Sequence, residues 1–278
     1  MDNTSNSKVV LSTILYYIIT YAYIYITSFF IIKYFPNLIS NPAVTIATII
    51  GAIAIFLVVA YLTYTLILGC DESGFLQSLG LTTRNLLESL SFSSSSIAIP
   101  AIALGIIAYI GGADPVRMIF EDVVRYLENA PPPWFSEVPN HILPLASIAV
   151  WSLVGIVWFA FLQVFPLNLL SRVAGPASVL VVSLLFILIY GAPLLTGDWK
   201  PDDIVILGVL FPIVLYRYRN SLGAVMSYVL LYEMPVRAAF LQGWGFTALK
   251  ILVALQALWG LISIIITLQI ISRGNRLG

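Results

Sequence analysis

The chain has 278 residues, of which 60% are hydrophobic and only 9% are charged, and its formal net charge is zero. A soluble domain carries about a quarter charged residues, so this composition excludes a water-soluble surface. The balanced charge gives no electrostatic footprint for nucleic acid. Together with a mean hydropathy of +1.00, these values predict a single all-α, polytopic membrane domain over residues 1–278, with membrane lipid covering its outside.

Apolar runs recur along the chain and predict about eight transmembrane helices. A helix needs roughly 20 mostly apolar residues to cross the hydrocarbon core of a bilayer. A short interfacial helix, Asn85–Ser91, is expected before the third span, which is short unless Ser93–Ser96 enter the membrane. The spans are expected at residues 8–33, 43–69, 93–111, 143–165, 176–196, 203–217, 221–237 and 247–272.

The first span carries a stripe of tyrosines. Tyr17, Tyr21 and Tyr25 recur at every fourth residue, with Tyr16 and Tyr23 beside them. Tyrosine combines an apolar ring with a polar tip, so we expect these residues to pack against other helices and to meet the membrane interface. A cofactor or quinone site is the alternative interpretation.

Residues 112–142 form the longest polar stretch and are expected outside the membrane. Within it, Pro115–Asn129 has the pattern of an amphipathic helix, with Asp114 as its N-cap. We expect this helix to lie on the membrane surface or to dock on the spans. Trp134 and Phe135, which follow it, are expected at the interface. The apolar side of the helix would carry Val116, Ile119, Phe120, Val123, Val124 and Leu127.

Orientation is predicted from lysine and arginine in short loops, which favour the cytoplasmic side. The loops around Arg172 and Arg217 and the C-terminal tail are basic and lack acidic residues. We therefore expect a multi-pass protein of the cell membrane with both termini inside.

The sequence predicts no metal site and no cofactor. It has one cysteine, Cys70, and one histidine, His141, which excludes a thiolate cluster and multi-histidine zinc sites. The carboxylates that could bind a metal lie in polar segments beside basic neighbours, where a solvated surface is expected. These residues are Glu121, Asp122, Glu128, Asp198, Asp202 and Asp203.

One pair of ionisable residues falls within a predicted span. Glu233 and Arg237 are four residues apart, which places them on one face of a helix where an ion pair can form. Pro235 lies between them and would kink or end the helix. A structural ion pair at the end of a span is one interpretation. A functional site is the other, because ionisable groups in the membrane are costly to bury.

Three blocks between about residues 155 and 235 carry a family resemblance. Val157, Trp158 and Leu162 stand at the Glu, Glu and Arg of a Glu-Glu-x-x-x-Arg motif. Phe186 and Tyr190 stand at Phe-x-x-x-His. In the third block the histidine falls on Tyr228 or Val229, and the residue four positions later on Tyr232 or Glu233. In this spacing the segment resembles the CAAX-protease and bacteriocin-processing (CPBP) family of intramembrane proteases, which has about eight membrane helices.

The residues at the motif positions depart from the family. The resemblance implies that glutamates and histidines there would activate a water for peptide hydrolysis. Val157, Trp158 and Leu162 cannot accept a proton, and tyrosines, with a pKa of about 10, are hydrogen-bond donors at neutral pH. General acid–base groups contribute about 10²–10⁴-fold in rate. We therefore predict no proteolysis of the family's type.

The favoured hypothesis is a non-catalytic CPBP-like membrane protein, a pseudoprotease, that binds or scaffolds a membrane protein partner. One alternative is an accessory subunit of a larger membrane complex. Another is a transporter of a lipid or apolar small molecule, because the breakers within spans come without charges. A fourth is an active CPBP-like protease with an atypical site.

Overall fold

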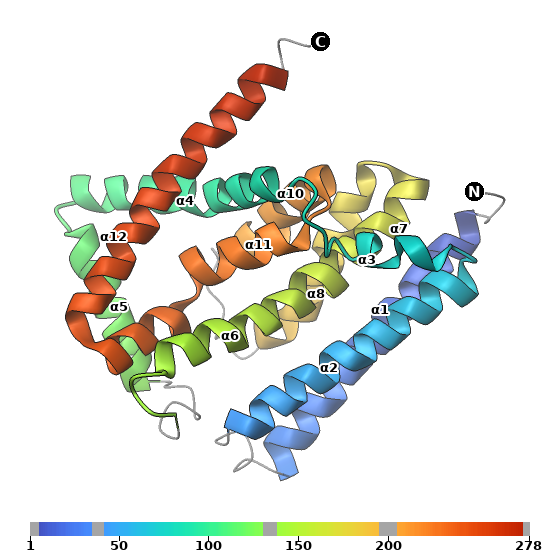
Figure 1. Ribbon diagram of the computed structural model, residues 1–278, viewed down its shortest axis with the longest axis horizontal. Helices are drawn as coiled ribbons and strands as arrows, with labels where there is room; N and C mark the ends of the chain where they lie inside the picture. Colours follow the sequence, from blue (N-terminus) through green and yellow to red (C-terminus); the bar gives the residue numbers. More distant parts are fainter. Residues whose placement is uncertain (1–5, 35–41, 130–137, 195–204, 275–278) are drawn as a thin grey trace.

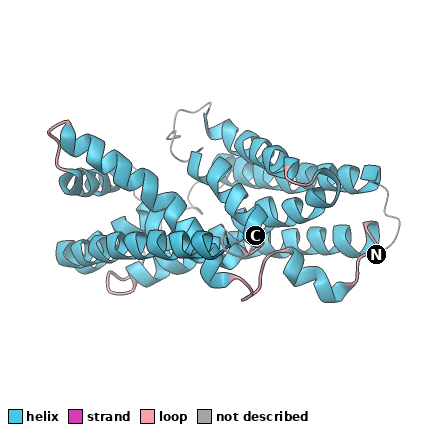
Figure 2. Cartoon of the chain, turned by 90° about the horizontal axis from the view of Figure 1, so that it is seen from above, coloured by secondary structure: helices cyan, strands magenta, loops and turns pink. Residues whose placement is uncertain are grey.

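The computed structural model describes residues 6–34, 42–129, 138–194 and 205–274. Every regular element in these ranges is a helix, and none of them is a strand (Figure 2). Helices are the expected result for long apolar runs, because a helix satisfies its backbone N–H and C=O groups internally where no water is present. The predicted all-α class is confirmed for this part of the chain.

The described chain consists of α-helices, several of which are continued by π-helical segments. Figure 1 shows α1 and α2 side by side at one edge of the molecule, with α4, α6, α8 and α11 forming its body. The α-helices are α1 (Asn6–Tyr34), α2 (Pro42–Leu62), α3 (Phe75–Ser78), α4 (Leu86–Ile110), α5 (Pro115–Asn129), α6 (Leu143–Ile156), α7 (Phe165–Ala174), α8 (Ala177–Leu194), α10 (Phe211–Tyr218), α11 (Ser221–Ser227) and α12 (Met234–Gly274). The π-helical segments are η2 (Thr63–Ile67), η5 (Val157–Val164), η6 (Ile206–Leu210) and η7 (Tyr228–Tyr232), and a 3₁₀ turn, η3, covers Glu72–Gly74.

Five helices in the described ranges are long and apolar enough to cross a membrane. They cover Asn6–Ile26, Ile46–Ile67, Leu86–Ile110, Leu143–Ala174 and Met234–Arg273. The other three predicted spans coincide with shorter apolar helices, over Ala177–Leu188, Ile206–Tyr218 and Ser221–Leu231.

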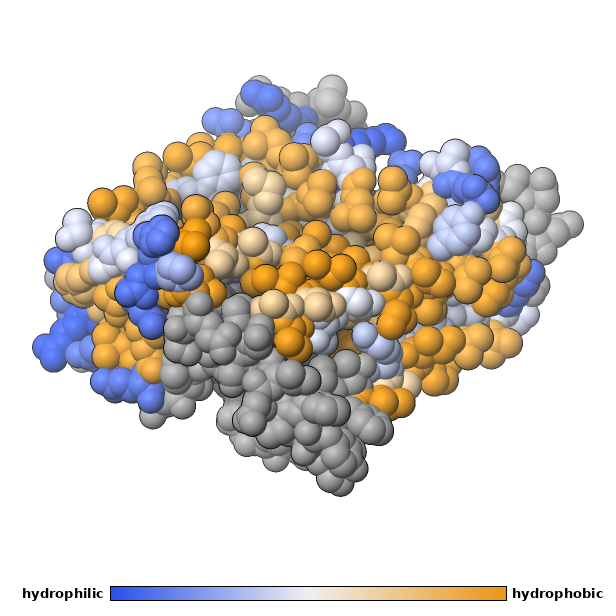
Figure 3. All heavy atoms as spheres, turned by 60° about the horizontal axis from the view of Figure 1, so that its bottom comes forward, coloured by the Kyte–Doolittle hydropathy of each residue, from blue (hydrophilic) through white to orange (hydrophobic). Residues whose placement is uncertain are grey.

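The surface agrees with a membrane environment. Many large apolar side chains point outward, among them Leu66, Ile107 and Leu188, each at least 65% exposed. In the view of Figure 3 the apolar residues form a continuous surface, and the hydrophilic ones gather toward its ends.

Helix α4 differs from the prediction because it begins at Leu86 and continues without a break to Ile110. The segment expected as a separate interfacial helix and the serines after it therefore belong to one helix. The serine hydroxyls are buried against other helices: Ser94 shares a hydrogen bond of 2.9 Å with Ser227, and Ser95 one of 2.9 Å with Thr267. Small polar residues allow close helix approach and bond across the interface, so this half of α4 can lie inside the bundle.

Three other predicted span boundaries also differ. The span expected at 143–165 continues through η5 and α7 to Ala174. The span expected at 221–237 stops at Glu233, whose backbone is extended (φ −65°, ψ 112°). Arg237 therefore belongs to α12, which also contains the predicted span 247–272. Helix α12 bends at Gly245, whose φ of 83° suits a residue without Cβ.

The amphipathic helix is present as α5 with the predicted bounds. Asp114 caps it, because one of its carboxylate oxygens accepts from the backbone N–H groups of Val116 and Arg117 at 3.0 and 3.2 Å. Val123 is fully buried, and Phe120 packs on Phe246 of α12 with ring centroids 4.7 Å apart. The helix is thus docked on α12. Val116 and Val124, predicted for the apolar side, are exposed because they lie beside that contact.

Candidate functional site

The positions singled out by the family resemblance meet in the larger buried core. Segment η5 carries Trp158, and η7 carries Tyr228; their ring centroids are 5.3 Å apart. Phe159 lies 5.5 Å from the Tyr228 ring and stacks on Phe211 of α10 at 4.8 Å. Aromatic rings at these distances attract each other beyond their area burial, so this cluster joins η5, η7 and α10 firmly.

The other positions surround this cluster or lie outside the described side chains. Val157, Leu162, Phe186 and Val229 are all buried in the same core. The side chains of Tyr190 and Tyr232 lie outside the described residues, as do Trp134, Phe135, Asp198, Asp202 and Asp203. The structure therefore brings together residues of η5, α8 and η7 that the sequence analysis singled out.

The π-helical turns of this core receive hydrogen bonds from side chains of other helices. The Tyr16 hydroxyl donates to the Phe161 carbonyl at 3.0 Å, and the Tyr17 hydroxyl to the Leu162 carbonyl at 2.8 Å. A π-helical turn shifts the backbone ladder, and its carbonyl groups can accept an additional bond. Of the tyrosines in the first span, Tyr16 and Tyr17 thus fasten α1 to η5.

Gln163 plays a similar part for the next π-helical segment. Its amide nitrogen donates to the Leu207 carbonyl of η6 at 3.0 Å. Its amide oxygen is buried and has no hydrogen-bond partner among the described residues. Sequence reasoning missed Gln163, although a glutamine inside an apolar span is the signal that could have found it.

Glu233 and Arg237 lie at the junction between η7 and α12. Glu233 is 5% exposed and immediately precedes α12; its backbone carbonyl accepts from the backbone N–H of Arg237 at 3.4 Å. The Arg237 guanidinium donates to the Leu231 carbonyl at 2.7 Å and to the Gln256 side chain at 3.1 Å. These bonds satisfy a carbonyl at the end of η7, where a helix leaves such groups without internal partners. Pro235 fits the first turn of α12. The Glu233–Arg237 ion pair itself stays a prediction.

Gln256 completes this junction from the other part of α12. Its amide nitrogen donates to the Leu230 carbonyl at 2.6 Å, next to the carbonyl that Arg237 holds. The sequence analysis did not select Gln256, although it is a polar residue in an otherwise apolar span. The junction is therefore a polar link between η7 and both parts of α12.

The buried Glu233 carboxylate also affects the pKa of a tyrosine on α5. The pKa of Tyr126 is raised to about 12, first by burial of its ring and then by the negative charge of Glu233. Burial disfavours the tyrosinate, and a neighbouring carboxylate adds to this effect. This electrostatic effect links Glu233, at the junction of η7 and α12, with the docked helix α5.

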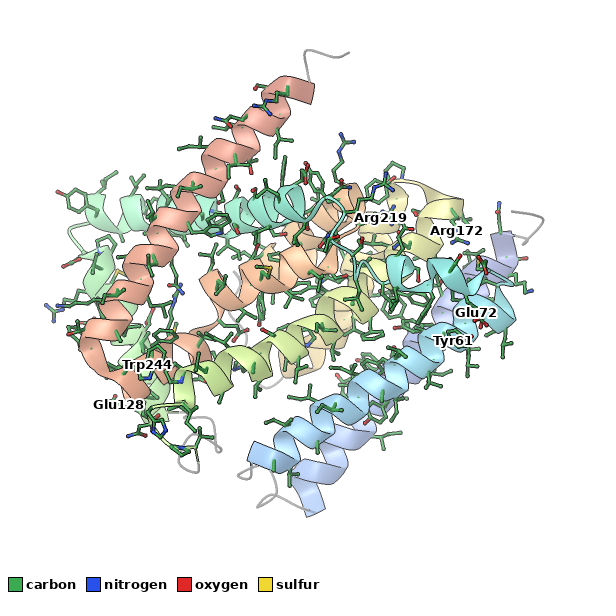
Figure 4. The ribbon with its side chains drawn as sticks, in the orientation of Figure 1. Tyr61, Glu72, Glu128, Arg172, Arg219 and Trp244 are labelled. Atoms are coloured by element: carbon green, nitrogen blue, oxygen red, sulfur yellow. The ribbon has the colours of Figure 1, made fainter. Side chains whose placement is uncertain are left out.

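The remaining candidates lie apart from the core. The carbonyl of His141 accepts the indole N–H of Trp244 at 2.9 Å, which ties the start of α6 to α12 (Figure 4). Glu121 pairs with Arg117 and Asp122 with Arg125, both on the exposed side of α5. No group of three or more His, Cys, Asp or Glu residues that could hold a metal ion occurs among the described residues.

The five long apolar helices identify a helical membrane protein, and its candidate site is a buried aromatic cluster with one carboxylate nearby. No family model, no curated protein and no solved structure matches the chain.

Proposed function

We propose that the protein is a non-catalytic, CPBP-like integral membrane protein that binds or scaffolds a membrane protein partner. One observation supports this most directly. The motif positions that would carry two glutamates and a histidine hold Val157, Trp158 and either Tyr228 or Val229, all in one core where the Tyr228 ring packs on Trp158 and Phe159. Aromatic packing of this kind stabilises a fold but supplies no general base.

The proposal includes eight passes through the membrane. The five long helices and three shorter apolar helices alternate along the chain with polar turns. Each short helix is joined to another helix by a single turn or a π-helical segment. Interrupted helices of this kind are tolerated in a membrane where they are buried among other helices. Eight passes with both termini inside is the arrangement that the basic loops favour.

A hydrolysis assay tests the non-catalytic part of the proposal. The full chain, reconstituted in liposomes, would be given a fluorogenic prenylated peptide and, separately, a transmembrane peptide. We expect no product above the level of protein-free liposomes. Glu233→Gln is the informative variant, and Glu128→Gln, on the helix α5, is its matched control. Hydrolysis that Glu233→Gln abolishes and Glu128→Gln retains would contradict the proposal.

Site-specific photocrosslinking in native membranes tests for a protein partner. The photoreactive residue would replace exposed apolar residues on different helices: Leu66 of η2, Ile107 of α4 and Leu258 of α12. A scaffold protein should give a discrete protein adduct from one of these faces and none from the others. The absence of a protein adduct from all three positions would contradict a stable lateral partner.

A further inference from the structure

Two arginines lie on neighbouring elements toward the end of the molecule where α1 begins, linked through Asn168. Arg172 is in the last turn of α7, and Arg219 follows α10 (Figure 4). Asn168 lies one helical turn before Arg172, on the same face of α7. The side-chain oxygen of Asn168 accepts from the Arg219 guanidinium at 2.9 Å, and its nitrogen donates to the Ser78 carbonyl at 2.7 Å. Asn168 therefore holds Arg219 against the turn that carries Arg172.

In the part of the chain that the structure describes, neither guanidinium forms a salt bridge with a carboxylate. Among the described residues, Arg117 and Arg125 pair with carboxylates, but Arg172 bonds to the Cys70 sulfur at 3.2 Å and Arg219 to Asn168. Arg219 is half-buried, and burial lowers its pKa. A partly desolvated cation is stabilised by an anion, and no described carboxylate pairs with either arginine, although Asp71 and Glu72 directly follow Cys70.

The surroundings of the two arginines fit the level of lipid headgroups. The Arg172 guanidinium lies over the Tyr64 ring at 6.0 Å, and the Arg219 guanidinium over the Tyr216 ring at 4.7 Å. Tyrosines gather where the hydrocarbon core meets the headgroups. Exposed apolar residues continue from here toward the middle of the bundle, such as Ile213 on α10, 51% exposed. A lipid bound here would place its phosphate at the arginines and its acyl chains along this surface.

We propose that Arg172 and Arg219 form a binding site for the headgroup phosphate of an anionic phospholipid. Guanidinium groups bind phosphate through paired, charge-assisted hydrogen bonds. Basic pockets between helices on the cytoplasmic side recognise anionic headgroups in the same way. This site does not depend on the proposed scaffold function, because it lies outside the aromatic core.

Native mass spectrometry of the full chain in detergent tests the site, with phosphatidylglycerol and phosphatidylcholine titrated separately. We expect the unmodified chain to prefer phosphatidylglycerol by about tenfold, the effect of one to two charges near the surface. R172Q/R219Q should lose that preference. The matched control is R84Q/R217Q, which removes two exposed arginines near Arg219: Arg217 is two residues before it, and the Arg84 carbonyl accepts from Asn220. This control should keep the preference within about threefold.

A further double variant and a soluble ligand complete the test. R172K/R219K keeps both charges but loses the planar fork, so its preference should fall between those of the unmodified chain and R172Q/R219Q. Thermal unfolding in phosphatidylcholine would show whether R172Q/R219Q folds. If it does not fold, the lipid preference of R172K/R219K tests the site instead. Equal losses in the two glutamine doubles would overturn the site in favour of diffuse surface charge. Inorganic phosphate that binds without lipid, with the same arginine dependence, would overturn the assignment to a lipid.

Discussion

Tyr16 and Tyr17 each donate a hydrogen bond to a carbonyl of a helix that is more than a hundred residues away in the chain. Both side chains are almost fully buried, and the carbonyls they reach belong to the π-helical segment η5. In a membrane the loss of such a bond leaves a buried carbonyl without a partner, where no water can replace the hydroxyl. These two hydroxyls therefore stabilise the irregular turn beside the aromatic cluster.

Removing one of these hydroxyls should destabilise the protein measurably. Tyr17→Phe keeps the ring and deletes the hydroxyl, so we expect a loss of about 1 kcal/mol in the free energy of unfolding. Unfolding by steric trapping or by denaturant in detergent would measure it. Tyr109→Phe is the matched control, because Tyr109 is 74% exposed. Equal effects of the two substitutions would contradict the role of Tyr17.

The surroundings of Glu233 and Arg237 show what residue spacing could not predict. The sequence analysis placed Glu233 and Arg237 on one helix face, whereas the backbone of Glu233 is extended and immediately precedes α12. Two contacts of Arg237, with the Leu231 carbonyl and with Gln256, depend on how α12 folds back along η7. Spacing along the chain cannot indicate such contacts, because they arise from the packing of two helices.

At the scale of elements, α5 is the helix whose bounds and cap the sequence determined. Asp114 precedes Pro115, and its carboxylate accepts two of the backbone N–H groups that the first turn leaves free. Asp114→Ala should destabilise α5 by about 1 kcal/mol. Amide hydrogen exchange at Val116 and Arg117 would detect this as faster exchange.

Asp114→Asn is the control for this prediction. Asparagine is as good an N-cap as aspartate, so exchange should stay close to that of the unmodified chain. Faster exchange in Asp114→Asn, equal to that in Asp114→Ala, would show that charge rather than capping matters.

The docking of α5 should depend on alkaline pH through Tyr126. Its pKa is raised to about 12 in the folded protein, above the ordinary value of about 10. The neutral form is therefore favoured in the fold, and its stabilising effect is complete below about pH 10 and is lost as the pH rises toward 12. The absorbance of tyrosinate at increasing pH, together with the exchange of α5 amides, would follow the change.

Two variants test the cause of this pH dependence. Tyr126→Phe should make α5 docking insensitive to pH between about 10 and 12, because it has no ionisable hydroxyl. Glu233→Gln should lower the Tyr126 pKa by removing the negative charge beside it, while burial keeps the pKa above its ordinary value. A Tyr126 pKa that Glu233→Gln leaves unchanged would contradict the coupling between the core and α5.

At the scale of the whole molecule, the helices place the basic loops at one end. Arg172 and Arg219 lie in or beside the connections toward the end where α1 starts, and Glu128 of α5 lies at the other end (Figure 4). Basic loops remain on the cytoplasmic side. We therefore expect the end that carries Cys70 to face the cytoplasm.

Cysteine labelling would test this orientation. A membrane-impermeant maleimide should label Cys70, the single cysteine of the chain, only after the cell membrane is opened. Ala113→Cys in a Cys70→Ala background, next to α5 at the opposite end, should be labelled in intact cells. The reverse pattern would show that both termini lie outside.

The sequence by itself determined the helical membrane class and the capped helix α5, and it predicted about eight apolar spans, five of which are long apolar helices in the described part of the chain. These features depend on composition, on the length of apolar runs and on contacts between neighbours in the chain. The tertiary structure alone decided that the serines of α4 lie inside the bundle, that Tyr16 and Tyr17 bind η5, and that Trp158 meets Tyr228. In a chain this apolar, hydrophobicity hardly distinguishes one helix face from another, because lipid and protein interior attract the same side chains. Hydrogen bonds and ring contacts between distant helices make that distinction, and they exist only in the packed fold.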